Sequence, residues 1–261
     1  MDFDKRTKLA SKVAKKSGKM ILKMQSWAGS TTKGVNDVVT AADYASEKLI
    51  TDAIIKHFPE DGIIAEEGSN RESKSGYTWV IDPLDGTLNY SRGLFMYGVS
   101  VGYLYESKPA GGAVYFPKFN ELFVAEKGKG AYLNGKQIHV SENGVGNLTT
   151  GLDCSNRHLE YRDLHFSVHN ILVKNSFMVA KLMCSVAGIC YTACGRYDAY
   201  MCLDTYLWDI SPSGLILEEA GGRVSKLNGQ PVDYLQQEGQ FFVGTNQVVC
   251  DEVIKLVKHN I

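Results

Sequence analysis

Residues 79–90 read Trp79-Val80-Ile81-Asp82-Pro83-Leu84-Asp85-Gly86-Thr87-Leu88-Asn89-Tyr90. The apolar start of this segment predicts a short buried strand. The strand runs into two carboxylates, Asp82 and Asp85, which lie three residues apart with no basic residue between them. Such a pair repels itself and costs stability unless a cation lies between the two groups.

The step from Asp85 to Gly86 and Thr87 predicts the start of a helix. Backbone N–H groups at the start of a helix attract an anion. A cation site beside an anion site indicates a metal-dependent enzyme that acts on a phosphate group.

Composition excludes several other classes of protein. The chain has 261 residues, enough for one large domain or two smaller ones, and a formal net charge of −1. This balance argues against a general nucleic-acid binder, which is normally strongly basic. No apolar run approaches the length of a membrane span, and the charged N-terminus lacks the apolar segment of a signal peptide. We therefore expect a cytoplasmic protein with no membrane partner.

Six cysteines lie at positions 154, 184, 190, 194, 202 and 250, several of them in apolar, periodic contexts. In a cytoplasmic chain of this size, such residues are expected to be buried thiols rather than disulfides. Cys190 and Cys194 have helical spacing, but no second pair of cysteines or histidines has the spacing of a zinc site.

The first part of the chain is expected to contain two helices followed by strands. The helices are predicted over 5–24 and 41–57, and the strands over 62–65, 78–81, 98–105, 112–116 and 121–125. The last three strands suggest an antiparallel meander. Asn134-Gly135 lies between two apolar runs and predicts a hairpin.

The second part alternates between the two kinds of element. Strands are predicted over 149–154, 176–180, 198–202 and 241–244, and helices over 159–173, 184–195, 210–220 and 246–258. Gly221-Gly222 is typical of the end of a helix. The pattern predicts a layered α+β fold, with a boundary near residue 145 that divides the chain into 1–145 and 146–261.

Three further acids stand out beside Asp82 and Asp85. Glu66 follows a predicted strand, Asp209 opens a predicted helix, and Asp43 lies near the start of another. Oxygen ligands without histidine or cysteine favour Mg²⁺ over zinc or copper.

Each acid also has a purely structural interpretation. Asp209 fits a helix N-cap, and Asp43 fits a capping box with Thr40. Glu66 fits a solvated turn, and Asp82 and Asp85 fit turn positions before a glycine. No single residue decides between these interpretations. The combination of the acids and the sequence motifs around them decides.

The segment Asp82 to Tyr90 closely resembles the D-P-x-D-G-T-x-N-F/Y motif of the inositol monophosphatase family. Residues 208–214 and 218–222 are similar to its second motif, W-D-x-A-A-G followed by E-A-G-G. Ala65-Glu66-Glu67-Gly68, Val39-Thr40-Ala41-Ala42-Asp43 and the hairpin segment 125–135 match further family segments in the expected order. The resemblance covers nearly the whole chain and implies a layered α-β-α-β-α sandwich of the inositol monophosphatase and fructose-1,6-bisphosphatase type.

The resemblance implies two or three Mg²⁺ ions. Glu66, Asp82 and the Leu84 carbonyl are expected to hold the first ion. Asp82, Asp85 and Asp209 are expected to hold the second, and Glu66 also contacts a weaker third ion. Lithium inhibition and a homodimer are further expectations from the family.

The resemblance also assigns the catalytic groups, which are Thr87, Asp43 and Glu66. The Thr87 hydroxyl, held by Asp43, is expected to orient the attacking water. The N–H groups of Gly86 and Thr87 are expected to bind phosphate oxygens. No covalent phosphoenzyme is needed, because phosphoryl transfer asks mainly for positioning and charge neutralisation.

The substrate side departs from the family. The substrate-binding residues expected by position are Asp85, Gly86, Thr87, Cys184, Ser185, Cys202 and Asp209. Cys184 stands where the family has serine or threonine, and Cys202 stands where the animal enzymes carry a sugar-binding glutamate. These differences suggest a changed pocket or simply a tolerant rim.

The expected substrate is a small phosphorylated polyol or sugar, inositol 1-phosphate first. Fructose 1,6-bisphosphate, histidinol phosphate and 3′-phosphonucleotides are the alternatives, and Ser211-Pro212 resembles the wording of the histidinol phosphatase branch. A non-enzymatic alternative is a regulatory protein that binds RNA or RNA polymerase. Its binding surface would be the N-terminal helix, which carries Lys5, Arg6, Lys8, Lys12, Lys15, Lys16, Lys19 and Lys23.

Overall fold

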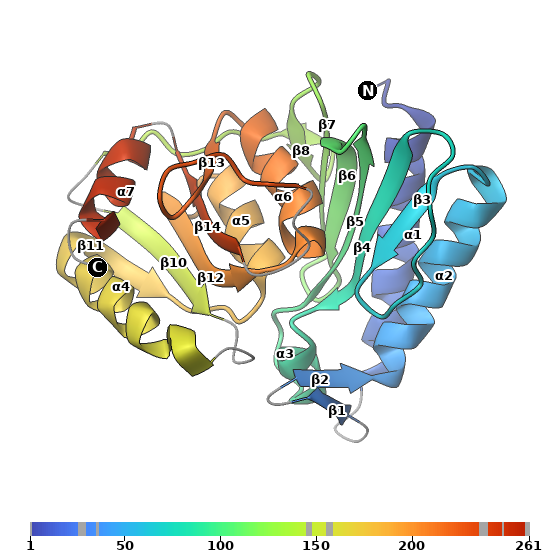
Figure 1. Ribbon diagram of the computed structural model, residues 1–261, viewed down its shortest axis with the longest axis horizontal. Helices are drawn as coiled ribbons and strands as arrows, with labels where there is room; N and C mark the ends of the chain where they lie inside the picture. The colour runs from blue at the N-terminus through green and yellow to red at the C-terminus, as the bar shows by residue number, and fades with distance from the viewer. Residues whose placement is uncertain are drawn as a thin grey trace.

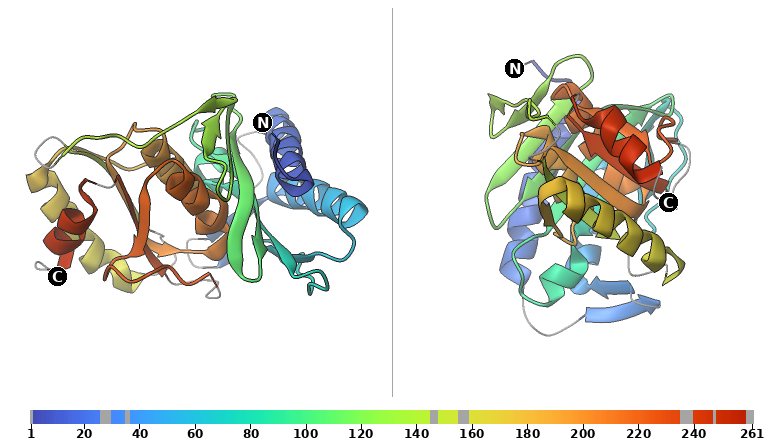
Figure 2. Two further views of the ribbon diagram at one scale, coloured as in Figure 1. Left: turned by 90° about the horizontal axis from the view of Figure 1, so that it is seen from above. Right: turned by 90° about the vertical axis from the view of Figure 1, so that its left-hand side faces the viewer.

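The structure, a computed structural model, describes residues 2–25, 30–34, 37–144, 148–154, 159–234, 240–246 and 248–258. Its elements stack in five layers, helices alternating with sheets (Figures 1 and 2). The layered α-β-α-β-α sandwich and the α+β class predicted above are confirmed. The predicted boundary between 1–145 and 146–261 lies outside the described residues and stays a prediction.

The first two layers are a helix pair and a seven-stranded sheet. Helices α1 (Lys5–Met24) and α2 (Ala41–His57) cover one face of this sheet. Its strands follow chain order: β3 (Gly62–Ala65), β4 (Tyr77–Asp85), β5 (Gly98–Tyr105), β6 (Lys108–Phe116), β7 (Glu121–Glu126), β8 (Ala131–Leu133) and β9 (Lys136–Gln137). β3 and β4 are parallel, and the remaining neighbours are antiparallel.

The other layers form the second part of the molecule. Helices α5 (Ser185–Ala193) and α6 (Leu207–Glu219) lie between the two sheets. The second sheet has the order β11 (Ser176–Ala180), β10 (Leu148–Cys154), β12 (Ala199–Thr205), β14 (Gln240–Thr245), β13 (Arg223–Lys226). Its outer face carries α4 (Arg162–Asn175), preceded by the 3₁₀ turn Leu159–Tyr161, and α7 (Cys250–Lys258).

Two short elements lie below the main layers in Figure 1. They are the hairpin of β1 (Ser30–Gly34) with β2 (Asp37–Thr40) and the helix α3 (Thr87–Ser91). β2 leads directly into α2, and α3 directly follows β4. Both junctions contain residues of the predicted site.

Helix α6 packs unusually closely on the first sheet. Pro212 lies over Gly102 and Gly112, which are cross-strand neighbours on β5 and β6. A β-carbon at either glycine would lie 2.8 Å from the Pro212 Cβ, so a larger residue would push the helix away. The sequence Ser211-Pro212 therefore has a packing role, which weakens its value as a pointer to the histidinol phosphatase branch.

Most predicted elements are observed, including both N-terminal helices, the meander and the hairpin at Asn134-Gly135. Gly221 has φ +87°, as expected beyond a helix end. The predictions missed β13 and the β1–β2 hairpin. The helix predicted over 246–258 was started too early, since it begins at Cys250.

The predicted start of helix 210–220 was wrong in a way that matters for the site. α6 begins at Leu207, so Asp209 is its third residue; it is not the N-cap itself but the acidic member of the capping box with Tyr206. All six cysteines are free thiols, as predicted, and five are buried. No helix among the described residues is long and apolar enough to cross a membrane.

Candidate active site

A cavity of about 140 Å³ lies where β4, α5 and α6 meet. All the predicted metal-binding and substrate-binding residues line it: Glu66, Asp82, Leu84, Asp85, Gly86, Thr87, Cys184, Ser185, Cys202 and Asp209. Asp43 does not line the cavity and lies behind Thr87 instead. The topology thus gathers side chains from positions 66 to 209 into one hollow.

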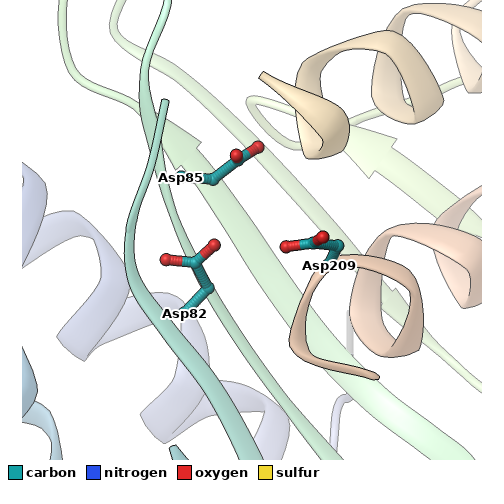
Figure 3. A group of neighbouring side chains, drawn as sticks. All are labelled: Asp82, Asp85 and Asp209. Atoms are coloured by element: carbon teal, nitrogen blue, oxygen red, sulfur yellow. The ribbon is translucent and has the colours of Figure 1, made fainter. Parts of the chain in front are cut away.

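Three of the carboxylates that line the cavity lie close together. Asp82 and Asp85 come from the end of β4, and Asp209 comes from the first turn of α6 (Figure 3). One oxygen of each lies within 4.8 Å of the others. β4 belongs to the first sheet and α6 to the layer between the sheets, so the group exists only in the assembled molecule.

The electrostatics of this group are unfavourable without a cation. Burial raises the pKa of Asp82 well above its usual range, and the charges of Glu66 and Asp85 raise it further. Burial also raises the pKa of Asp85 to about 6. Lys, Arg and His are absent from the described residues that line the cavity. Within the described lining, therefore, no positively charged side chain offsets the repulsion between Asp82 and Asp85.

Glu66 approaches the group along the parallel pair of strands. Its N–H donates to the Ile81 carbonyl at 3.2 Å, which continues the β3–β4 ladder to the residue before Asp82. The turn after Glu66 is held by the buried Glu47 of α2. Glu47 accepts hydrogen bonds from the N–H groups of Glu67, at 2.8 Å, and Ser69, at 3.0 Å.

Asp43 makes the contacts that both of its interpretations require. Its Oδ2 accepts from the N–H of Thr40 at 2.9 Å, which completes the capping box of α2. Its Oδ1 lies 3.1 Å from the Thr87 hydroxyl, which also lies 2.8 Å from the Leu84 carbonyl. Burial raises the pKa of Asp43 to about 6, against the hydrogen bonds from Thr40 that lower it. The capping interpretation and the catalytic one are thus compatible.

Asp85 is held from the second part of the chain. Its Oδ2 accepts from the N–H of Val186 at 2.8 Å and from the Cys184 thiol at 3.2 Å. These contacts fix one carboxylate oxygen at the start of α5. Cys184, predicted to bind substrate, therefore contacts a predicted metal ligand directly.

The segment before α5 is itself anchored on both sides. The Asn89 side chain donates to the carbonyls of Leu182, at 2.8 Å, and Met183, at 3.2 Å. The buried Asp153 of β10 accepts from the N–H groups of the same two residues, at 3.2 Å and 2.9 Å. Met183 adopts the left-handed φ of +53°, rare for a side-chain-bearing residue, so this segment is held in a strained shape.

Asp209 is oriented within its own helix. Its Oδ2 accepts from the N–H of Tyr206 at 3.2 Å, the back-bond of an acidic residue at the third helical position. The rings of Tyr206 and Trp208 stack at 5.1 Å and line the cavity beside it. The side chain of Asp209 thus lies at the start of α6, facing the carboxylates of Asp82 and Asp85.

Several residues around the site were not predicted. They are Glu47, Asp153 and Asn89, which position other residues, and Asp204 and Tyr206, which line the cavity. Asn89 belongs to the motif, but no role was predicted for it. The buried carboxylates carry no local signal in the sequence, because their partners are backbone N–H groups far along the chain.

The residues present fit a divalent cation that prefers oxygen. Six carboxylates line the cavity: Glu66, Asp82, Asp85, Asp153, Asp204 and Asp209. Three of them converge within 4.8 Å, which is the spacing of ligands around one ion. Such a donor set suits Mg²⁺, which takes a few carboxylates and keeps its waters.

Comparison with known proteins agrees with the fold and the donor set. The model of the inositol monophosphatase family matches residues 2–260, and the chain belongs to that family of phosphatases. It is 36% identical to the protein named Nus factor SuhB from Pasteurella multocida, over 85% of both chains. It is 32% identical to the fructose-1,6-bisphosphatase/inositol-1-monophosphatase of Thermotoga maritima, over 86% of this chain and 84% of that one. The solved structure of a Thermotoga maritima IMPase superposes with a TM-score of 0.87 at 29% identity, covering 98% of each chain.

Proposed function

We propose that this chain is a Mg²⁺-dependent phosphomonoesterase whose substrate is inositol 1-phosphate. The observation that carries the proposal is the convergence of Asp82, Asp85 and Asp209 in a cavity whose described lining has no basic residue. The chain belongs to a family of phosphatases. The ions, the roles of single residues and the substrate are proposed here.

The metal ligands are assigned by position in the cavity. Glu66, Asp82 and the Leu84 carbonyl would hold one ion, Asp82, Asp85 and Asp209 a second, and Glu66 would reach a third. Mg²⁺ bound there would lower the pKa of water and would neutralise charge on the phosphate and the departing oxygen. Lithium, as a small competing cation, is expected to inhibit.

The protein's own groups prepare the attack. The Thr87 hydroxyl has one proton and two acceptors within reach, Asp43 and the Leu84 carbonyl. In the proposed reaction it donates to Asp43, and the Thr87 oxygen accepts a hydrogen bond from a water. That water is thereby oriented toward the phosphate. The N–H groups of Gly86 and Thr87, at the turn from β4 to α3, bind phosphate oxygens in this proposal.

The alcohol part of the substrate would contact Cys184, Ser185 and Cys202. The Ser185 hydroxyl lies 3.7 Å from the Cys202 sulfur, so hydroxyl and thiol groups adjoin on this wall. Fructose 1,6-bisphosphate is a second candidate substrate, and the name of the Thermotoga maritima relative supports it. Histidinol phosphate and 3′-phosphonucleotides are the third and fourth candidates.

Phosphate release from these four substrates, with and without Mg²⁺, tests the proposal. We expect inositol 1-phosphate to have the highest kcat/KM. If it is the poorest substrate, the substrate assignment is wrong. If none of the four is hydrolysed in a Mg²⁺-dependent way, the assignment of the metal site falls as well.

A homodimer is proposed because the edge strand β11 of the second sheet exposes apolar side chains. Phe177 is 83% exposed, and Phe166 on the neighbouring helix α4 is 62% exposed. An open strand edge with apolar side chains is suited to pairing with a second copy. Light scattering is expected to give a dimer, and Phe177→Asp a monomer; a monomeric wild type would contradict the proposal.

A second candidate function is regulatory binding to RNA or RNA polymerase through α1. Six exposed lysines at spacings of three or four residues form one face of this helix: Lys5, Lys8, Lys12, Lys16, Lys19 and Lys23. The helix contains no acidic residue, and one relative is named a Nus factor. This second function is favoured because the charged side chains on this face are all positive.

The second function is separable from the first. Lys12→Glu, Lys16→Glu and Lys19→Glu together should abolish salt-dependent retention on RNA or RNA polymerase and spare phosphatase activity. The same exchange at Lys56, Lys118 and Lys136, exposed elsewhere, is the control. An equal loss of retention in both triple variants, or a wild type that is not retained at all, would contradict the regulatory binding function.

A further inference from the structure

Helix α6 contains a proline, which removes one of its hydrogen bonds. Pro212 has no N–H, so it cannot donate to the carbonyl of Trp208 four residues earlier. A buried carbonyl without a partner costs stability. The missing donor is supplied from outside the helix: the hydroxyl of Ser100 donates to the Trp208 carbonyl at 3.0 Å.

Ser100 is well placed to connect the two elements that carry the carboxylates. It lies fully buried on β5, directly opposite Asp82 in the β4–β5 ladder. Its acceptor, Trp208, immediately precedes Asp209. One side chain therefore links the strand pair that presents Asp82 to the helix turn that presents Asp209.

The same proline sets the distance between these elements. Gly102, two residues beyond Ser100 on the same face of β5, and Gly112 leave the space that the Pro212 ring fills. Proline thus brings α6 close to the sheet and at the same time frees the carbonyl that Ser100 binds. Packing and hydrogen bonding act at the same contact.

We propose that Ser100 is a positioning residue for the metal site, and that it sets Mg²⁺ affinity by fixing the Trp208-Asp209 turn of α6 to β5. This proposal rests on the function proposed above, in which Asp82 and Asp209 are metal ligands. Ser100 is not among the residues that line the cavity, so its effect is indirect. The serine is required only because residue 212 is proline.

That last condition makes the proposal testable by a double-mutant cycle. Ser100→Ala leaves the Trp208 carbonyl without a donor, and we expect the Mg²⁺ constant for activation to rise about tenfold. Pro212→Ala restores an N–H at position 212. In that background Ser100→Ala should change the Mg²⁺ constant less than about twofold, because the helix then satisfies its own carbonyl.

The readout is Mg²⁺ binding by calorimetry together with the Mg²⁺ dependence of phosphate release, which a loss of stability alone does not shift. Ser225→Ala removes a buried serine hydroxyl from β13 in the other sheet and is the matched control. It should leave the Mg²⁺ constant unchanged. An equal shift in Ser100→Ala with either residue at position 212 would overturn the proposal.

Two further outcomes are decisive. If Ser100→Ala does not fold, the double variant Ser100→Ala/Pro212→Ala is compared with Pro212→Ala. Equal Mg²⁺ constants then support the proposal, and a tenfold difference overturns it.

Asp82→Asn distinguishes a failure of the Ser100 proposal from a failure of the metal site. If Asp82→Asn binds no Mg²⁺ while Ser100→Ala binds it as the wild type does, the role of Ser100 fails and the metal site stands. If Asp82→Asn keeps both binding and turnover, the metal site itself fails.

Discussion

The carboxylate of Asp43 accepts a hydrogen bond from the hydroxyl of Thr87 at 3.1 Å and in this way connects the first turn of α2 to the start of α3. The two residues are 44 positions apart, and each lies at a junction between elements. Their contact orients a hydroxyl at the wall of a cavity lined by carboxylates. In the proposed reaction, this hydroxyl orients the attacking water.

Thr87→Ala should therefore lower kcat by about 10²–10⁴-fold at saturating Mg²⁺, the usual range for a lost proton-handling or water-orienting group. The fold should persist, because the hydroxyl lies at the cavity wall. Thr87→Ser keeps the hydroxyl and should retain most activity. Comparable kcat values for Thr87→Ala and the wild type would exclude the assigned role.

The stability of the metal-free protein should fall as the pH rises. The pKa values of Asp82 and Asp85 are raised in the folded state, that of Asp85 to about 6. The folded chain then holds protons that the unfolded chain has already released. For Asp85 this contribution is complete below about pH 4 and lost as the pH passes through about 6, and Asp82 acts in the same direction.

Mg²⁺ requires the deprotonated carboxylates, so its effect should have the opposite pH dependence. We expect millimolar Mg²⁺ to raise the Tm more at about pH 7.5 than at about pH 5. Melting curves in EDTA provide the reference at each pH. A gain in Tm that is the same at both values would show that these carboxylates do not bind the ion.

Asp82→Asn should abolish turnover and yet stabilise the metal-free chain. The change removes one negative charge from a buried group whose members raise one another's pKa values. A gain of about 1 kcal/mol in stability from the reduced repulsion would raise the Tm by about 2–4 °C for a chain of this size. The Tm of the variant should no longer respond to Mg²⁺, and a response as large as that of the wild type would contradict the ligand assignment.

Glu47→Ala should weaken the site without touching the cavity. It removes both acceptors of the turn after Glu66, so the N–H groups of Glu67 and Ser69 lose their partner. We expect a loss of about 1–3 kcal/mol in stability and a Mg²⁺ constant raised about tenfold. The exposed Glu72→Ala is the control. A Mg²⁺ constant that is unchanged in Glu47→Ala would limit Glu47 to a structural role.

Most of the fold could be predicted from the sequence, because hydrophobic periodicity and sequence motifs can be recognised within short segments. Helix 41–57 and strand 62–65 were placed at their observed bounds. The short strand β13 was missed because four residues carry little periodic signal. Asp209 was placed at the start of its helix because Trp208 and Leu207 were not recognised as its first turn.

The site could be predicted only in part. The convergence of Asp82, Asp85 and Asp209 followed from matching motifs, and the structure brings them within 4.8 Å. The bond between Ser100 and the Trp208 carbonyl could not be foreseen, since it depends on the register of β4 with β5 and on the approach of α6. Contacts between distant segments require the assembled layers.

The segment Leu182–Met183 is held by Asn89, next to the first sheet, and by Asp153, on the second. Cys184 and Val186, which follow it closely in the chain, hold Asp85. Heating that separates the two sheets by a small amount would thus release Asp85 while both sheets keep their hydrogen bonds. Thermal inactivation is accordingly expected several degrees below the loss of secondary structure, and the gap between the two temperatures measures how firmly the sheets are joined.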